Sequence, residues 1–109
     1  MSQVKCISIL KALPGQPHEE FASRWVNGHA PIPASWKNLK KYSINIPNLA
    51  WHKDKGEGCL FDGTAELYWD SYEEMLEDMN SPLGEKGNKD AEEFVSCCIN
   101  LYCEEHVIK

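Results

Sequence analysis

His29 is the side chain in this sequence best suited to carry a proton between two groups. It follows an apolar stripe of helical spacing that contains Trp25, with Gly28 before it and Pro31 two residues beyond. Imidazole titrates near neutral pH, so a histidine fixed where a helix meets a loop can act as a general acid or base. The simpler interpretation is a histidine at a helix C-terminus, where the helix dipole favours a cation. The residues alone leave both interpretations open.

Carboxylates and tyrosines gather on one face of two predicted strands. Side chains alternate between the faces of a strand, so residues 61–69 and 97–108 each divide into an apolar and a polar face. The apolar faces, which include Ile99 and Leu101, are predicted to pack on helices. The opposite face of the sheet would then hold Asp62, Glu66, Tyr68 and Tyr102. Such a face is either a wetted surface, which antiparallel sheets commonly have, or one wall of a pocket closed by a second copy.

The cysteines do not fit a disulfide framework or a metal site. There are five, an odd number, and Cys97 and Cys98 are adjacent. These features favour a reducing compartment. A zinc site built from these two with Cys103 and His106 is disfavoured because strand alternation divides the four side chains between opposite faces. We therefore expect no metal.

Four strands are predicted to position these side chains. Each is rich in β-branched or apolar residues and is bounded by turn-forming residues. The strands are predicted at Val4–Ala12, 40–46, 61–69 and 97–108. Residues 48–60 are predicted to form a long polar loop, in which Trp51 either lines a hydrophobic ligand site or simply packs at an interface.

Two main helices are predicted between the strands. The first begins at Pro17 and ends at Gly28, and the second begins at Ser71, where Glu74 completes a capping box. A break follows the second helix, and a short extra helix is predicted over residues 90–95. The order βαββαβ predicts an α+β, ferredoxin-like fold with a four-stranded antiparallel sheet. Two helices cover one face of such a sheet, so the other face must meet solvent or a partner.

Length and charge narrow the function classes. A chain of 109 residues with 42% hydrophobic and 26% charged residues fits one globular domain. The net charge of −6 disfavours nucleic acids and anionic membrane surfaces as partners. There is no apolar run of about 20 residues and no signal-peptide pattern, so we expect a cytoplasmic protein. No Gly-x-Gly-x-x-Gly segment opens a helix, and we expect no cofactor.

Several segments resemble the signatures of the EthD-like family, in order and spacing, over nearly the whole chain. The strongest match is FDGTAELYWDS at residues 61–71. The others are KALPG at 11–15, EEF at 19–21, WVNGHAPI at 25–32 and KYSIN at 41–45, with Phe94 and a terminal strand ending in Glu104 and Glu105.

The resemblance implies a single domain over residues 1–109 that pairs into a dimeric α+β barrel, with the uncovered sheet faces enclosing the interior. It also implies that His29 is a pocket residue, since this histidine is the most characteristic polar position of the family. Four further residues match motif positions and are secondary candidates: Tyr42, Asn45, Asp62 and Glu66.

We expect a small cofactor-independent enzyme of the isomerase, lyase or dehydratase type, acting on a small hydrophobic carbonyl, lactone or aromatic compound. His29 would move a proton α to the carbonyl. Burial among aromatic side chains is expected to raise the pKa of Asp62 or Glu66, so that the neutral acid can hold the developing oxyanion. The predicted substrate-binding residues are Trp25, Tyr42, Asn45, Tyr68, Tyr102 and Trp51.

Two other functions fit the same residues. The first is a non-catalytic ligand-binding or accessory protein of an oxygenase system. The second is a monooxygenase, either free of cofactors or dependent on haem. Fold alone does not decide among these functions.

Overall fold

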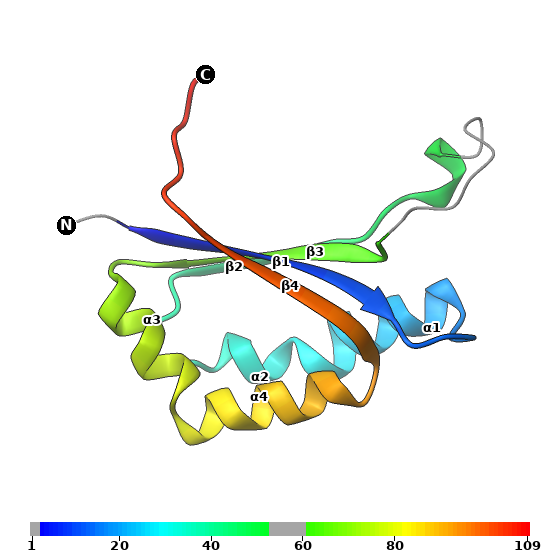
Figure 1. The fold of residues 1–109 in the computed structure, drawn as a ribbon, viewed down its shortest axis with the longest axis horizontal. Helices are drawn as coiled ribbons and strands as arrows, with labels where there is room; N and C mark the ends of the chain where they lie inside the picture. The colour runs from blue at the N-terminus through cyan, green and yellow to red at the C-terminus, as the bar shows by residue number, and fades with distance from the viewer. Residues whose placement is uncertain (1–2, 53–60) are drawn as a thin grey trace.

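The computed structural model describes residues 3–52 and 61–109. Four strands form one antiparallel sheet in the order β2-β3-β1-β4. Apart from the short turn η2 (Leu49–Trp51), the helices lie together on one side of this sheet and leave the other side open (Figure 1). The predicted α+β ferredoxin-like fold is confirmed. The strands are β1 (Val4–Ala12), β2 (Lys41–Asn45), β3 (Gly63–Trp69) and β4 (Val95–Cys103).

The first helical region is longer than the sequence predicts. It consists of α1 (His18–Ser23), the π-helix η1 (Arg24–His29) and α2 (Pro31–Ala34). The Ala30 N–H donates to the Trp25 carbonyl at 2.9 Å, a bond that spans five residues in place of four. The predicted end at Gly28 is therefore wrong. Pro31 does not end the helical region, because it lies in the first turn of α2, where its missing N–H is not needed.

The second helical region contains two full helices. The capping box of α3 (Tyr72–Met79) is confirmed, since the Ser71 Oγ accepts from the Glu74 N–H at 3.2 Å. Ser81 then caps α4 (Pro82–Glu92) in the same way. The short helix predicted over residues 90–95 is wrong, because residues 90–92 end α4, residues 93–94 form a turn and Val95 begins β4. The turn η2 (Leu49–Trp51) lies in the predicted long loop, and residues 53–60 of that loop lie outside the described residues.

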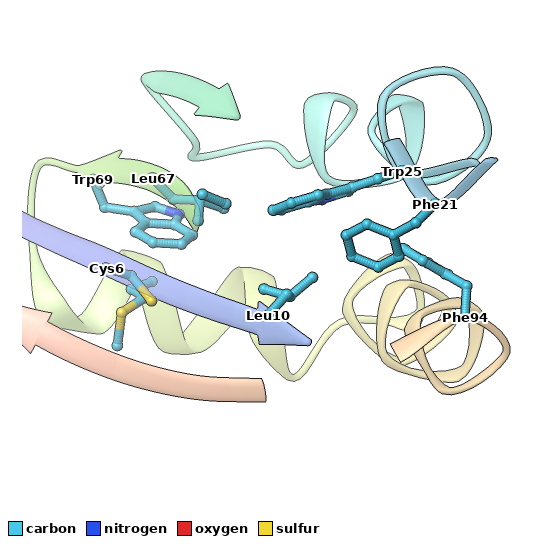
Figure 2. Packing of buried hydrophobic residues seen from close by; sticks show 9 residues of the cluster. Cys6, Leu10, Phe21, Trp25, Leu67, Trp69 and Phe94 are labelled. Atoms are coloured by element: carbon cyan, nitrogen blue, oxygen red, sulfur yellow. The ribbon is translucent and has the colours of Figure 1, made fainter. Parts of the chain in front are cut away.

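The hydrophobic core lies between the sheet and the helices. Figure 2 shows Phe21, Trp25 and Phe94 gathered at one end of it. The ring centroid of Phe21 lies 5.5 Å from that of Trp25 and 5.7 Å from that of Phe94, which is within the favourable range for aromatic pairs. This cluster packs the first helical region and the end of α4 onto the sheet.

The faces of β4 are the reverse of those predicted. In the β1–β4 register, Cys98 pairs with Leu10, and Tyr102 pairs with Cys6. Directly paired residues share a face, and both Leu10 and Cys6 are buried under the helices. Tyr102 therefore lies on the helix side and Ile99 on the uncovered side. The alternation of apolar and polar residues predicts the wrong face because β4 is an edge strand with little helix cover. Its apolar side chains need not face the core.

The uncovered side carries an apolar stripe across β1 and β4. Ile9 pairs with Ile99 and Ile7 pairs with Leu101 on this side. We call these four residues the open-face stripe. Ile99 and Leu101 are 41% and 48% exposed, so the described residues leave the stripe as a partly exposed apolar surface. Within the described ranges, no helix is long and apolar enough to cross a membrane.

Candidate active site

A small cavity lies between the helices and the sheet. Its volume is about 110 Å³, and its walls include Trp25 and His29 of η1, Tyr42 of β2, Ser8 of β1 and Asn100 of β4. A cavity of about 150 Å³ is known to hold benzene in a protein core. The space therefore suits a ligand of about one small ring or less. Most of its lining is apolar or aromatic, as in typical ligand sites.

His29 is held at this cavity by a half-buried carboxylate. Its Nδ1 lies 2.8 Å from the Oδ2 of Asp90, and the two side chains are only 12% and 18% exposed. An ionised carboxylate can only accept hydrogen bonds, so the proton of neutral His29 resides on Nδ1. The other ring nitrogen, Nε2, then keeps its lone pair and can accept a proton. This is the arrangement that a general base requires.

Arg24 keeps Asp90 in its charged form. Its guanidinium donates two hydrogen bonds to the carboxylate, at 3.0 and 2.7 Å. These bonds are the main reason that the pKa of Asp90 lies below its ordinary value, and the contact with His29 lowers it further. Arg24 also lies over the ring of Phe94, 4.8 Å from its centroid. The chain Arg24–Asp90–His29 thus joins η1 to α4.

Sequence reasoning missed Asp90 as a partner of His29. It was assigned to the start of a short helix, whereas it lies near the end of α4. Glycines made the segment look like a break, although Gly84 and Gly87 are buried on the packed side of α4. The spacing of Gly84, Gly87 and Ala91 is the signal that could have revealed a closely packed helix.

Tyr42 also lines the cavity, and its phenol hydroxyl is a second polar group whose protonation can be stated. Burial raises the pKa of its phenol to about 12. The hydroxyl is therefore neutral at physiological pH and can donate a hydrogen bond. The structure brings Tyr42 and Trp25, two of the predicted binding residues, to the same cavity as His29.

Three other predicted residues form a separate cluster on the uncovered face of the sheet. Asn45 donates to Glu66 at 2.9 Å, and the Tyr68 hydroxyl donates to Glu105 at 3.2 Å. Lys5 lies 2.6 Å from both glutamates. The hydrogen bond from Lys5 is the main cause that lowers the pKa of Glu66, so the raised pKa predicted for this carboxyl is wrong. The sheet separates this cluster from His29.

The remaining predicted residues do not line the cavity. Asp62 accepts a hydrogen bond from the Ala12 N–H at 2.7 Å, just before β3. Trp51 is 81% exposed on η2, and Tyr102 is 55% exposed on β4. In the described part of the chain, no three potential metal ligands come together.

Comparison with known proteins places this architecture in a family. The model of the EthD domain matches residues 13–96, which is more than half of the chain. The chain belongs to the EthD family. A similar solved structure is an ethyl tert-butyl ether D family protein from Bacillus halodurans. It shares 21% identity over 95% of this chain and 99% of its own, with a TM-score of 0.77.

Two further structures share the fold of this EthD protein. One is a dimeric protein of unknown function from Bacteroides fragilis, with 13% identity over 96% of this chain and 98% of its own and a TM-score of 0.72. The other is SnoaB, a cofactor-independent oxygenase from Streptomyces nogalater, with 10% identity, coverage of 98% and 96%, and a TM-score of 0.71. A search of curated protein sequences finds no match. At these identities the likeness shows the fold alone.

Proposed function

We propose that this EthD protein is a cofactor-independent acid/base enzyme that removes a proton from a small hydrophobic carbonyl, lactone or aromatic compound. The observation that carries the proposal is the half-buried contact of Asp90 with His29, a residue in the wall of a mostly apolar cavity. A base in such a site is shielded from water, and a hydrophobic substrate of about one ring fits beside it. The reaction is of the isomerase, lyase or dehydratase type.

The chemistry needs no group beyond these side chains. The Nε2 of His29 takes a proton from the carbon next to the carbonyl, and the bonding electron pair moves onto the carbonyl oxygen as an enolate. Asp90 stabilises the imidazolium that forms, and the neutral phenol of Tyr42 donates to the enolate oxygen. His29 then returns the proton to another carbon in an isomerase. In a dehydratase it gives the proton to a departing hydroxyl, which leaves as water.

Proton exchange tests this proposal without knowledge of the natural substrate. Acetophenone and γ-butyrolactone would be incubated with the protein in deuterium oxide, and loss of their α-proton signals followed by NMR. We expect His29→Gln to lower the exchange rate about 10²–10⁴-fold, the usual contribution of a positioned base. Val26→Gln, a change at an exposed position of the same helix, is the matched control.

The outcomes of this experiment separate the candidate functions. Exchange that is equal in the wild type and in a folded His29→Gln variant would overturn the role of His29. Binding of the probes without any exchange would favour the ligand-binding or accessory function. Consumption of dioxygen together with an oxidised product would favour a monooxygenase.

We also propose that two copies of the chain pair through their uncovered sheet faces. The open-face stripe offers the apolar surface for this contact. Both the C-terminal segment after β4 and the turn η2 extend beyond the sheet on this side (Figure 1). They carry exposed apolar side chains, namely Val107, Ile108, Leu49 and Trp51. A second copy seated on the stripe would be flanked by these two extensions.

The free thiols of Cys6, Cys97, Cys98 and Cys103 support a cytoplasmic location.

A further inference from the structure

Asn100 brings a further polar group to the cavity, from the edge strand β4. It lies on β4 directly opposite Ser8 of β1, and both residues line the same cavity as His29. His29 belongs to the helical layer and Asn100 to the sheet layer. A ligand in the cavity is therefore contacted by polar groups from both layers. The mechanism proposed above makes no use of Asn100.

The hydrogen bonds around Asn100 fix which of its atoms is free. The Ser8 hydroxyl donates to Oδ1 of Asn100 at 2.7 Å, and the Cys98 thiol donates to the same oxygen at 3.5 Å. The Cys6 sulfur lies 3.8 Å from the Ser8 oxygen and extends this chain into the core. Donors therefore converge on the amide oxygen. The amide nitrogen, which carries two N–H groups, takes part in neither bond.

The amide nitrogen keeps a donor for a ligand. Tyr102 lies two residues away on the same face, and its contact with Asn100 partly offsets the effect of burial, which raises the pKa of this phenol. Asn100 is exposed, and within residues 3–52 and 61–109 none of its hydrogen bonds is donated by Nδ2. Burial raises the pKa of Cys98, so its thiol stays protonated and remains a donor to Asn100.

We propose that Asn100 orients the substrate by donating a hydrogen bond from Nδ2 to an oxygen of the ligand. The ligand class that fits is a single-ring compound with two oxygen functions, one near His29 and one at Asn100. The cavity volume limits the ligand to about one ring, and polar groups in both layers call for polar groups at both ends of the ligand. The proposal rests on the proposed function, because it takes the cavity as the substrate site.

A pair of probes isolates the contribution of this hydrogen bond. The probes are cyclohexane-1,4-dione and cyclohexanone, single rings of nearly the same shape that share the ketone to be placed near His29 and differ by the second carbonyl oxygen. NMR titration gives the dissociation constant of each. In the wild type we expect the diketone to bind about threefold to tenfold more tightly, as for one hydrogen bond to a neutral acceptor.

Variants assign this preference to one side chain. Asn100→Leu should remove it, and Asn100→Asp, which has the same shape and no amide donor, should remove or reverse it. The matched control is Asn27→Leu on the exposed surface of η1, which should keep it. His29→Gln should also keep it, so failure here is distinct from failure of the proton-transfer proposal. Equal binding of the two probes by the wild type, or an unchanged preference in Asn100→Asp, would overturn the role of Asn100.

Discussion

Arg24 acts on the cavity without lining it. The guanidinium keeps Asp90 ionised, and only an ionised Asp90 can hold the proton of His29 on Nδ1. Arg24, Asp90 and His29 therefore form one hydrogen-bonded unit. Through Asp90, Arg24 influences which ring nitrogen of His29 carries the proton. The same contacts stabilise the fold, because they join η1 to α4.

Replacing Arg24 with methionine should lower stability in a pH-dependent way. The folded-state pKa of Asp90 is depressed, so the ionised carboxylate stabilises the fold above its ordinary pKa of about 3.9. This stabilisation is lost as the pH falls through the lower, folded-state pKa. We expect Arg24→Met to cost about 1–2 kcal/mol in free energy of unfolding at neutral pH, and progressively less below about pH 4. Urea unfolding across this pH range measures the cost.

A surface ion pair supplies the control for this measurement. Lys37 contacts Glu77 at 2.8 Å, but the two side chains are 79% and 58% exposed. Lys37→Met should therefore change stability by less than about 1 kcal/mol at any pH. A cost for Arg24→Met that is the same at acid and neutral pH would contradict the ionised Asp90 described above.

At the scale of the elements, Gly63 sets how closely β3 approaches the first helical region. Its φ is +154°, a value that side-chain-bearing residues rarely adopt. A Cβ at this position would lie 2.6 Å from the Trp25 ring and 2.7 Å from the Asn45 carbonyl oxygen. The start of β3 therefore packs directly against the aromatic wall of the cavity.

Gly63→Ala should destabilise the protein much more than a glycine substitution without steric contacts. We expect a loss of about 2–4 kcal/mol, from backbone strain together with overpacking of Trp25. Gly15 also has a positive φ, +81°, but a Cβ there would meet nothing within 4 Å. Gly15→Ala should cost only about 1 kcal/mol. Similar thermal unfolding of the two variants would refute the close packing at Gly63.

The sequence predicts helices and strands better than it predicts which side chains contact one another in the fold. β1 was placed at its true limits and the Ser71 cap was found, because alternation and capping are local signals. The faces of β4 were reversed, since apolar side chains at an edge strand can serve a partner in place of the core. His29, Trp25 and Tyr42 were named as candidates and share one cavity. Asn100 at the cavity and Asp90 beside His29 were missed, because only the tertiary fold brings them to these places.

At the scale of the whole molecule, the two faces of the sheet have different tasks. One face forms the cavity with the helices. The other face carries the open-face stripe and the ion pairs of Lys5 with Glu66 and Glu105. A substitution in the stripe can therefore change assembly without touching the cavity. This separation allows the dimer proposal to be tested independently of any activity.

Ile99→Lys should convert the proposed dimer to a monomer. A lysine at this position would be buried without a partner in the centre of the contact, so the dissociation constant should rise about 100-fold or more. Analytical ultracentrifugation over a range of concentrations measures it. Val26→Lys is the matched control, because Val26 is similarly exposed, at 46%, and lies on η1 away from the stripe. A wild type that sediments as a monomer, or an Ile99→Lys dimer, would exclude this interface.

The π-helix η1 also has a consequence for reading related sequences. It fits one residue more into the stretch from Trp25 to Ala30 than an α-helical turn would hold. Each residue of an α-helix turns the chain by about 100°. A homologue shorter by one residue here would regain regular helical bonding and would point its histidine away from the α4 carboxylate. We therefore expect a homologue with an alignment gap of one position in this segment to keep the fold and to lack the contact between the histidine and the α4 carboxylate.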